Sequence, residues 1–455
     1  MSDRISSWKN RYLSFGGQLQ LVISVLSAMH VYWSLVFILP TRIIKELEAK
    51  MRGFLWCQGP MARGKAKVSW DAVCMPKYEG GLGIRRISEM NIALMASNAW
   101  SIVIHRESLW VAWIHTYRLK DRNFWDCQIP NNCSWSWRKI LQVRSLIQPY
   151  IWAKVGNGEK ISAWYDKWKE VGPLKSFLSP RAISNAGFNL KTKVKDIWDD
   201  GRWCWPEEWL RLYPILNGIS QQVLVEEIQD KFYWKSENKM LDFPSSVAWQ
   251  SVRTNGNEVA WVDIVWFSKC IPKHAFLMWL IMRKKLLTQD KILRWEHTRG
   301  SSMNMMCCVL CYGNVDSHDH LFFSCKYSSQ VWNLIRDQAN MEDVNPVWED
   351  VNPVWEEIIS WLLDRRSLKK LNNVVARLIT AAAAYYIWRE RNARLFRNTT
   401  RPPDVLAKHI LATVRYKLMG MKFKNTCQVV ETLRKWSIHG NLIVDGDNQA
   451  SNMDT

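Results

Sequence analysis

The sequence lacks several features that mark common classes of protein. Its 11 cysteines are sparse among 455 residues and odd in number, which excludes a scaffold built on disulfides. The first ten residues hold no apolar core and no small-residue cleavage site, so no secretory signal peptide is expected. Acidic side chains are also few, since 42 Asp and Glu face 62 Lys and Arg, and the net charge is +20. The apolar fraction of 48% nevertheless excludes wholesale disorder, and the length predicts two to four domains at roughly 150 residues each.

One long segment carries no charge at all. Residues 19–40 contain no Asp, Glu, Lys or Arg, and about 20 apolar residues can span a bilayer. Several polar side chains, however, fall on one helical stripe, namely Gln20, Ser24, Ser27 and Ser34. We therefore expect residues 19–39 to form a buried amphipathic helix, with a membrane segment as the alternative, and we expect no membrane partner.

Helical periodicity dominates most of the chain. Apolar residues recur at helical intervals after Pro40 and again over 87–118. The motif Gly80-Gly81-Leu82-Gly83 is not followed by the Lys-Ser/Thr of a phosphate loop, so it predicts a turn. The pair Asn157-Gly158 stands between short apolar runs and predicts a β-hairpin near 152–164, because both residue types tolerate positive φ.

The strongest chemical motif is Cys308-x2-Cys311-x8-His320-x4-Cys325. A C-x2-C turn brings two thiolates to one side of a tight loop, and a second Cys/His pair completes a tetrahedron around Zn²⁺. Four protein ligands leave no open coordination position, so the zinc ion is expected to be structural. Two alternatives stay open at this stage: Cys307 in place of Cys308, and His318 in place of His320.

Positive charge is concentrated between Asp364 and Trp436. This stretch holds 17 Lys and Arg against 4 Asp and Glu, a net charge of +13. Such a patch attracts polyanions, of which nucleic acid is the commonest. Four side chains within it are candidate nucleic-acid-binding residues: Arg389, Arg391, Arg394 and Arg397. The alternative is that they solvate a helix that buries Ile387 and Leu395.

These observations predict a fold that is mainly α with minor β, a multi-part helical chain containing a small zinc-binding module. The expected parts are a helical region over 1–125, a Trp-rich connecting region over 126–244 with the hairpin, a zinc-binding domain over 245–340, a basic helical region over 341–440 and a disordered tail over 441–455. The heptapeptide Glu-Asp-Val-Asn-Pro-Val-Trp occurs twice in tandem within 342–355, which predicts an exposed segment that tolerates insertion.

The residues around the zinc motif resemble a known family. The motif is preceded by Trp-Phe-Ser-Lys-Cys-Ile-Pro-Lys-His-Ala-Phe-Leu-Met-Trp-Leu over 266–280 and by Lys-Leu-Leu-Thr-Gln-Asp over 285–290. Its second half reads His-Leu-Phe-Phe-Ser-Cys over 320–325 and is followed by Val331-Trp332. This collinear set resembles the zinc-binding domain that lies downstream of the reverse transcriptase in plant LINE-type (non-LTR) retrotransposons.

The resemblance extends from residue 8 to about residue 400. Its further marks are Leu13-Ser14-Phe15-Gly16-Gly17, Phe54-Leu55-Trp56, Cys74-Met75-Pro76-Lys77, Trp164-Tyr165-Asp166-Lys167-Trp168 and Ile387-Trp388. It implies that the chain is the C-terminal region of such a reverse transcriptase protein, and it places the polymerase palm of the family before residue 1.

The catalytic residues of the family are not recognisable. A polymerase holds two Mg²⁺ ions with paired Asp residues, typically in an aromatic-x-Asp-Asp turn. Asp199-Asp200 precedes Gly201-Arg202 and has no palm-like region upstream, and no RNase H carboxylate set follows Phe396. We therefore expect no polymerase or nuclease activity.

The expected function is that of a non-catalytic remnant with structural Zn²⁺ as cofactor and RNA or DNA as the partner of its basic region. Its expected compartment is the nucleus or the cytoplasm. The alternative is a structural or protein-interaction module, or a decayed element fragment with no nucleic-acid role. Whether the side chains of the 29 Trp are exposed or buried discriminates between these two functions. Exposed Trp beside Lys and Arg would favour base stacking, and buried Trp would favour packing.

Overall fold

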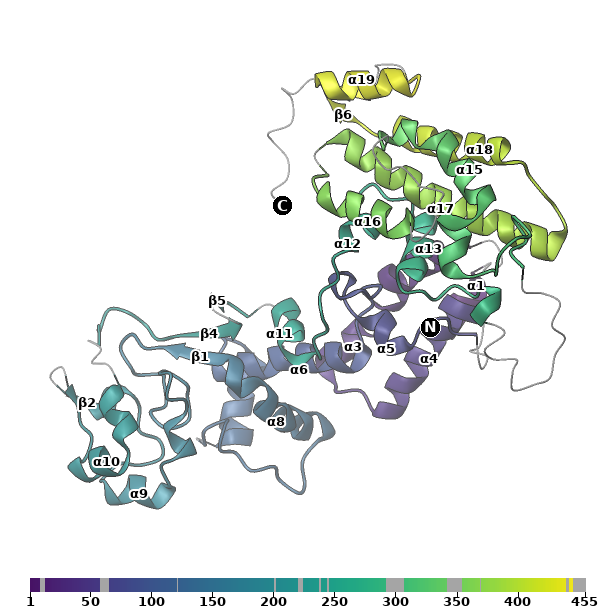
Figure 1. Cartoon of the computed structure of the whole chain (residues 1–455). Helices are drawn as coiled ribbons and strands as arrows, with labels where there is room; N and C mark the ends of the chain where they lie inside the picture. Colours follow the sequence, from purple (N-terminus) through teal and green to yellow (C-terminus); the bar gives the residue numbers. More distant parts are fainter. Residues whose placement is uncertain are drawn as a thin grey trace. The chain divides into compact units, whose positions relative to one another are not determined.

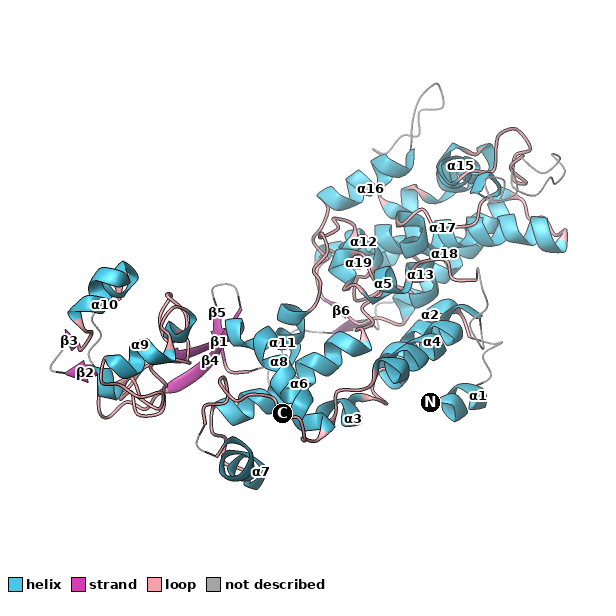
Figure 2. Cartoon of the chain, turned by 90° about the horizontal axis from the view of Figure 1, so that it is seen from below, coloured by secondary structure: helices cyan, strands magenta, loops and turns pink. Residues whose placement is uncertain are grey.

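The computed structural model describes residues 1–8, 13–57, 65–120, 122–199, 202–219, 224–236, 239–243, 245–291, 307–341, 354–368, 370–438 and 442–444. Helices make up most of these residues, and the strands are short (Figure 2). The prediction of a mainly α chain with minor β is confirmed. The chain divides into two compact units whose segments are not consecutive in sequence (Figure 1), whereas the predicted division was linear. Unit 1 comprises Met1–Leu26, Ala49–Ile84 and Gly256–Thr455, and unit 2 comprises Ser27–Glu48 and Arg85–Asn255.

Unit 1 is built around α13 (Pro272–Met282) and α17 (Leu371–Arg397), which pack on each other. Helix α13 is buried from His274 to Ile281, as its almost entirely apolar sequence requires. Helix α17 contains Ala381–Ala384, whose small side chains favour a helix and let its neighbours approach closely. The other described α-helices and strands of unit 1 are α1 (Ser2–Ser7), α2 (Phe15–Leu21), α5 (Trp70–Cys74), α12 (Val262–Val265), α15 (Lys326–Ile335), α16 (Val354–Asp364), α18 (Pro403–Met419), α19 (Cys427–Lys435), β6 (Phe423–Lys424) and β7 (Ile443–Val444).

Unit 2 has a helical half and a Trp-rich half, each with its own core. The helical core lies among α6 (Ile87–Val103), α8 (Trp135–Ile147) and α11 (Ser245–Val252), and the second core lies within 153–219. An antiparallel sheet in the order β1 (Ile151–Lys154), β4 (Lys231–Ser236), β5 (Lys239–Leu241) contributes side chains to both. The other described α-helices and strands are α3 (Val31–Val36), α7 (Leu109–Trp113), α9 (Pro180–Asn185), α10 (Glu207–Leu212), β2 (Trp198–Asp199) and β3 (Arg202–Trp203). The residues of α4 (Thr41–Cys57) are divided between the two units.

The β-hairpin predicted near 152–164 is not formed, because β1 pairs with β4 instead. The Asn-Gly turn is held in another way. The carboxylate of Asp230 accepts hydrogen bonds from the backbone N–H groups of Gly156 (2.7 Å), Gly158 (2.9 Å) and Lys160 (2.9 Å). Hydrogen bonds to a charged acceptor are the strong ones, so this buried carboxylate outweighs the local preference for a hairpin.

The uncharged segment 19–39 does not form one continuous helix. It contains the end of α2, a π-helical turn (Val22–Leu26) and the separate helix α3. The hydroxyl of Ser24 donates to the carbonyl of Gln20 (2.8 Å), a side-chain bond that competes with the regular helical ladder. The expected single buried helix is therefore wrong. Among the residues that the structure describes, no helix is both long and apolar enough to cross a membrane.

Two predicted segments fall largely outside the described residues. The tandem repeat within 342–355 is described only from Val354, where α16 begins. Of the tail over 441–455, residues 442–444 are described, and Ile443–Val444 pair in parallel with Phe423–Lys424. This part of the tail is a strand, contrary to the prediction of disorder.

Candidate metal centre

The C-x2-C motif forms a tight loop in unit 1. An isolated antiparallel bridge between Cys307 and Val315 closes the loop. Inside it, the N–H of Tyr312 donates to the carbonyl of Cys308 (2.7 Å), which completes a turn around the second cysteine. A turn of this kind directs two sulfur atoms to the same side of the backbone.

The four predicted ligands converge. The ligand atoms of Cys308, Cys311, His320 and Cys325 all lie within 4.8 Å of one another. The sulfur atoms of Cys308 and Cys325 are 3.9 Å apart, and Cys311 Sγ lies 3.2 Å from His320 Nε2. Tetrahedral zinc, with Zn–S of about 2.3 Å and Zn–N of about 2.0–2.1 Å, separates its ligands by about 3.5–3.8 Å. Both observed distances lie within about 0.3 Å of this range. The donor set therefore fits Zn²⁺ as a structural cofactor.

Hydrogen bonding and burial shift the pKa values of these ligands. The hydrogen bond with Cys325, and then burial, raises the pKa of Cys308 to about 12, and the same hydrogen bond lowers the pKa of Cys325. Burial lowers the pKa of His320, but its hydrogen bonds with Cys308 and Cys311 outweigh burial, and the net shift of this pKa is upward. Since zinc binds thiolates and neutral imidazole, metal binding releases protons from this cluster and weakens in acid.

Neither alternative ligand joins the cluster that the described residues form. Cys307 is exposed and takes part in the bridge with Val315. Neighbouring residues of an extended segment point to opposite sides, so Cys308 is the one that faces inward. His318 is buried, but its ring packs edge-on against Phe322 with centroids 5.4 Å apart. The geometry thus supports the ligand set with Cys308 and His320.

A small apolar core lies beneath the ligands. Helix α15 begins immediately after Cys325 and supplies three of the side chains of this core. The buried apolar side chains of this core are Leu321, Phe322, Val331, Trp332 and Ile335.

Helix α17 holds the C-x2-C loop from another side. Arg394 donates from Nη1 to the carbonyl oxygens of Val309 (3.3 Å) and Leu310 (3.2 Å), the two residues between the cysteines. Its guanidinium also lies over the ring of Tyr327, 4.5 Å from the centroid. Arg394 therefore fixes the backbone that carries two ligands, as outer-shell partners of metal sites commonly do.

Two buried carboxylates complete this attachment. Arg391, with 2% of its side chain exposed, forms an ion pair with Asp316, which is fully buried. Glu390 is also fully buried and accepts hydrogen bonds from Arg394 Nε (3.0 Å) and from the backbone N–H of Arg401 (2.8 Å). The sequence contains one weak signal for these carboxylates, which is that Glu390 is an acidic residue within a basic segment.

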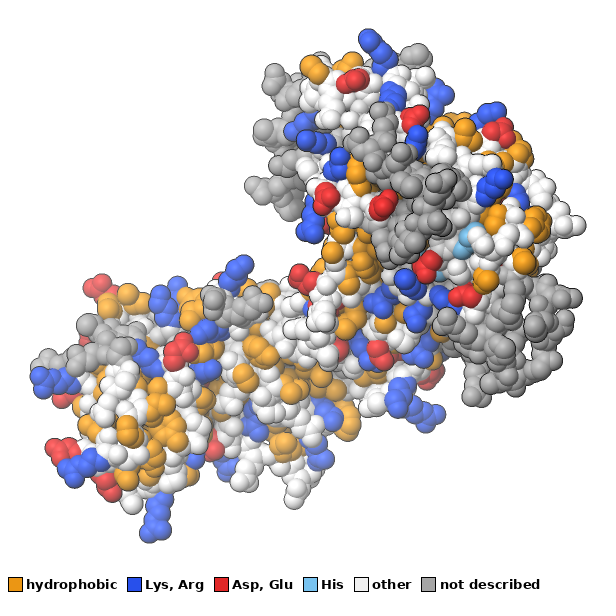
Figure 3. Space-filling model, viewed as in Figure 1, with side chains coloured by type: hydrophobic (Ala, Val, Ile, Leu, Met, Phe, Trp, Pro, Cys, Tyr) orange, Lys and Arg blue, Asp and Glu red, His pale blue; other side chains and the backbone are white. Residues whose placement is uncertain are grey.

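The four arginines predicted to bind nucleic acid therefore have different surroundings. Arg391 and Arg394 are engaged in contacts within the protein, whereas Arg389 and Arg397 are exposed. Figure 3 shows Lys and Arg spread over the part of the chain that holds α15 to α19, with Asp and Glu between them. Nucleic-acid binding by these residues stays a prediction, for which Arg389 and Arg397 are the accessible candidates.

Comparison with known proteins agrees with this zinc site. Residues 243–332 match a family model described as zinc-binding in reverse transcriptase. The chain is 25% identical over 423 residues to an Arabidopsis thaliana protein named as a ribonuclease H protein, and the match covers 89% of this chain and 64% of that relative. It is also 27% identical over 142 residues to an uncharacterized mitochondrial protein of the same plant, covering 31% of this chain and 92% of that relative.

The fold and the site define a helical protein that carries a structural zinc module. The matches add that this module is similar to the zinc-binding region of reverse transcriptases, and they support a retrotransposon-derived protein. The matched span of 243–332 lies close to the predicted zinc-binding domain of 245–340. The chain spans 64% of the length of the first relative.

Proposed function

We propose that this chain is a non-catalytic, zinc-containing region of a LINE-type (non-LTR) retrotransposon reverse transcriptase protein, and that it binds RNA or DNA. The observation that carries the proposal is the attachment of the Cys₃His cluster to the basic helix α17 through Arg394 and Arg391. Zinc binding would thereby hold this helix in place.

The proposed phosphate-binding surface consists of the exposed cations of the basic helical region. Arg389 and Arg397 lie on α17, Lys408 and Arg415 lie on α18, and Arg434 lies in the last turn of α19. Exposed Lys and Arg of this kind release counterions when they contact phosphates, which produces sequence-independent affinity.

Only four of the Trp side chains that the structure describes are exposed, namely Trp33, Trp110, Trp113 and Trp135. Thirteen of the Trp side chains that the structure describes are buried, among them Trp164, Trp234, Trp279 and Trp332. The proposed nucleic-acid contact therefore rests on Lys and Arg. A structural or protein-interaction module is the competing function, and it predicts a zinc-containing chain without salt-dependent binding to nucleic acid.

The zinc content of the purified full chain tests the first half of the proposal. We expect one zinc ion per chain by mass spectrometry of the metal. The Cys311→Ser variant should lose it, because three ligands hold zinc far more weakly than four. Cys427→Ser, which changes an exposed cysteine outside the cluster, is the matched control and should keep it. A folded chain without zinc would contradict the assignment.

The salt dependence of binding tests the second half. Fluorescence anisotropy with single-stranded RNA and DNA should show affinity that falls steeply between about 50 and 200 mM salt. Changing both Arg389 and Arg397 to Gln should reduce the slope by about 1 to 2, while changing the exposed Lys65 and Lys285 to Gln should not. Affinity without salt dependence would contradict phosphate contact. Mg²⁺-dependent primer extension or RNA cleavage by the chain would contradict the non-catalytic assignment.

A further inference from the structure

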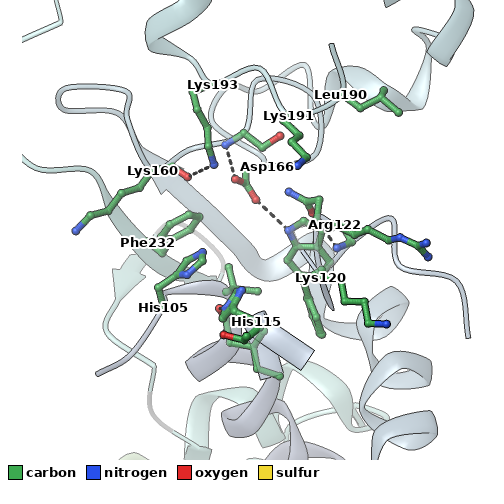
Figure 4. Close-up of a pocket in the computed structure, with 17 residues that line it drawn as sticks. His105, His115, Lys120, Arg122, Lys160, Asp166, Leu190, Lys191, Lys193 and Phe232 are labelled. Carbon is green, nitrogen blue, oxygen red and sulfur yellow. Dashed lines mark hydrogen bonds between the residues drawn. The ribbon is translucent and has the colours of Figure 1, made fainter. Parts of the chain in front are cut away.

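A pocket of about 780 Å³ opens within unit 2 (Figure 4). Its walls come from the end of α6, the π-helical turn Ile114–Leu119 with the loop after it, the turn after β1, the loop 190–193 and strand β4. Its volume falls within the range of about 300–1,000 Å³ that is usual for small-ligand pockets. The zinc module and the basic helical region belong to unit 1, so this pocket is separate from the site described above.

The lining of the pocket is strongly cationic. Asp166 is the one carboxylate among its described lining residues. The ammonium groups of Lys160 and Lys193 donate hydrogen bonds to neutral acceptors, the side chain of Gln229 (3.4 Å) and the carbonyl of Lys160 (3.1 Å) respectively. A concave surface lined by one sign of charge focuses the electrostatic potential. The lining cations are Lys120, Arg122, Lys160, Lys191 and Lys193.

The carboxylate of Asp166 forms hydrogen bonds within the protein. Asp166 Oδ1 accepts a hydrogen bond from Trp125 Nε1 (2.9 Å), and Oδ2 accepts one from the N–H of Ser162 (2.7 Å). Both bonds point its oxygens at neutral donors (Figure 4). Burial also raises the pKa of Asp166, which makes its charged form harder to maintain. This carboxylate therefore offsets little of the positive charge.

Imidazole and phenyl rings line the pocket beside the cations. The rings of His105 and His115 stack with their centroids 4.0 Å apart, and Phe232 of β4 lines the same pocket near His105 (Figure 4). Partial burial, and then the positive charges of His115, Lys193 and Lys160, lower the pKa of His105 to about 4. This imidazole is neutral at physiological pH, and it offers a flat face on which a base can stack.

The lining cations lie on two sides of the pocket. Figure 4 shows the side chain of Lys160 on one side and the side chains of Lys120 and Arg122 on the other. A basic groove that tracks a nucleic-acid backbone contacts successive phosphates in this way. The arrangement therefore indicates a ligand longer than one nucleotide.

We propose that this pocket binds a segment of single-stranded nucleic acid, with a base against His105 and Phe232, one phosphate at Lys160 and the next phosphate at Lys120 and Arg122. The proposal goes beyond the proposed function because it concerns unit 2. It can fail while the exposed cations of α17 to α19 bind nucleic acid, and it can hold while they do not.

The test is photo-crosslinking of the full chain to a single-stranded RNA of about 12 nucleotides that contains 5-iodouridine, a length within the usual range of site sizes. Adducts are mapped by mass spectrometry of the digested protein. We expect adducts on peptides that contain His105 or Phe232. An excess of uridine monophosphate should compete with the RNA only at much higher concentration, because its single phosphate reaches the cations on one side of the pocket only.

A charge-matched pair of variants decides the outcome. The pocket variant changes Lys120, Arg122 and Lys160 to Gln. The control variant changes Lys154, Arg181 and Lys239 to Gln, which are exposed cations of unit 2 outside the pocket. All six side chains are exposed, and circular dichroism and thermal unfolding of both variants verify the fold.

The pocket variant should lose these adducts and bind the RNA about tenfold more weakly, with a salt slope reduced by about 2, whereas the control variant should match the wild type. Adducts confined to unit 1, or equal losses in the two variants, would overturn the proposal. Equal competition by uridine monophosphate and RNA would also overturn it, because the ligand would then be a free nucleotide. The variants of Arg389 and Arg397 leave the pocket intact, so failure of one site is distinguishable from failure of the other.

Discussion

The buried ion pair between Arg391 and Asp316 should be a main support of the zinc module. Replacing Arg391 with Met leaves a fully buried carboxylate without its partner. Breaking a buried pair in this way typically costs about 3–5 kcal/mol. Asp316 Oδ2 keeps one hydrogen bond, from the backbone N–H of Gln289 (3.0 Å), so we expect the lower end of this range. About 3 kcal/mol corresponds to roughly a hundredfold loss in the equilibrium for folding of the module.

Zinc release during urea unfolding measures this effect locally. A chelating dye reports the free zinc, and the midpoint for Arg391→Met should fall well below that of the wild type. Arg389→Met changes the exposed neighbour on the same helix and should shift stability by less than about 0.5 kcal/mol. Adding Asp316→Asn to Arg391→Met should recover about 1 kcal/mol or more, because the double variant buries no unpaired charge. Equal midpoints for Arg391→Met and Arg389→Met would refute the reasoning.

Three further predictions concern other contacts of unit 1. A Cβ on Gly16 would lie 2.8 Å from the backbone of α13, so Gly16→Ala should lower the free energy of unfolding by about 1–3 kcal/mol. A Cβ on Gly17 meets only ordinary contacts, so Gly17→Ala should raise the free energy of unfolding by up to about 1 kcal/mol. Thermal unfolding of the two variants should therefore shift in opposite directions. Arg394→Lys cannot reproduce the forked hydrogen bonds to the C-x2-C loop and should weaken zinc binding about 10- to 100-fold in a competition titration, while Arg397→Lys, at an exposed site, should leave it unchanged. Burial, and then the charge of a neighbouring lysine, lower the pKa of His274 to about 3 from an ordinary value of 6.5. As the pH falls, His274 therefore takes up a proton in the unfolded state before it does so in the folded state. The free energy of unfolding should fall by up to about 1.4 kcal/mol per pH unit below pH 6.5. His274→Phe should remove this contribution, and urea midpoints with the same pH dependence in both proteins would contradict it.

The zinc site was predictable because its chemistry is local. All four ligands fall within eighteen residues, and a C-x2-C turn with a nearby Cys/His pair can hardly place its donor atoms anywhere else. The amphipathic helix α4 was predictable for the same reason, since its apolar stripe repeats within a few turns. The choice of Cys308 over Cys307 depended on the bridge that turns one of two adjacent thiols outward, and the spacing left that choice open.

Contacts between distant segments were not predictable from the pattern of residues. The turn at Gly156–Gly158 looked like a hairpin, but its partner is the carboxylate of Asp230, far along the chain. Arg391 and Arg394 looked like surface cations, but Asp316 and the C-x2-C loop occupy them. The basic pocket of unit 2 gathers Lys120, Lys160 and Lys193 from three loops that share no motif. Local spacing constrains only residues that the chain itself keeps close, whereas charge pairing and burial depend on which distant segments folding brings together.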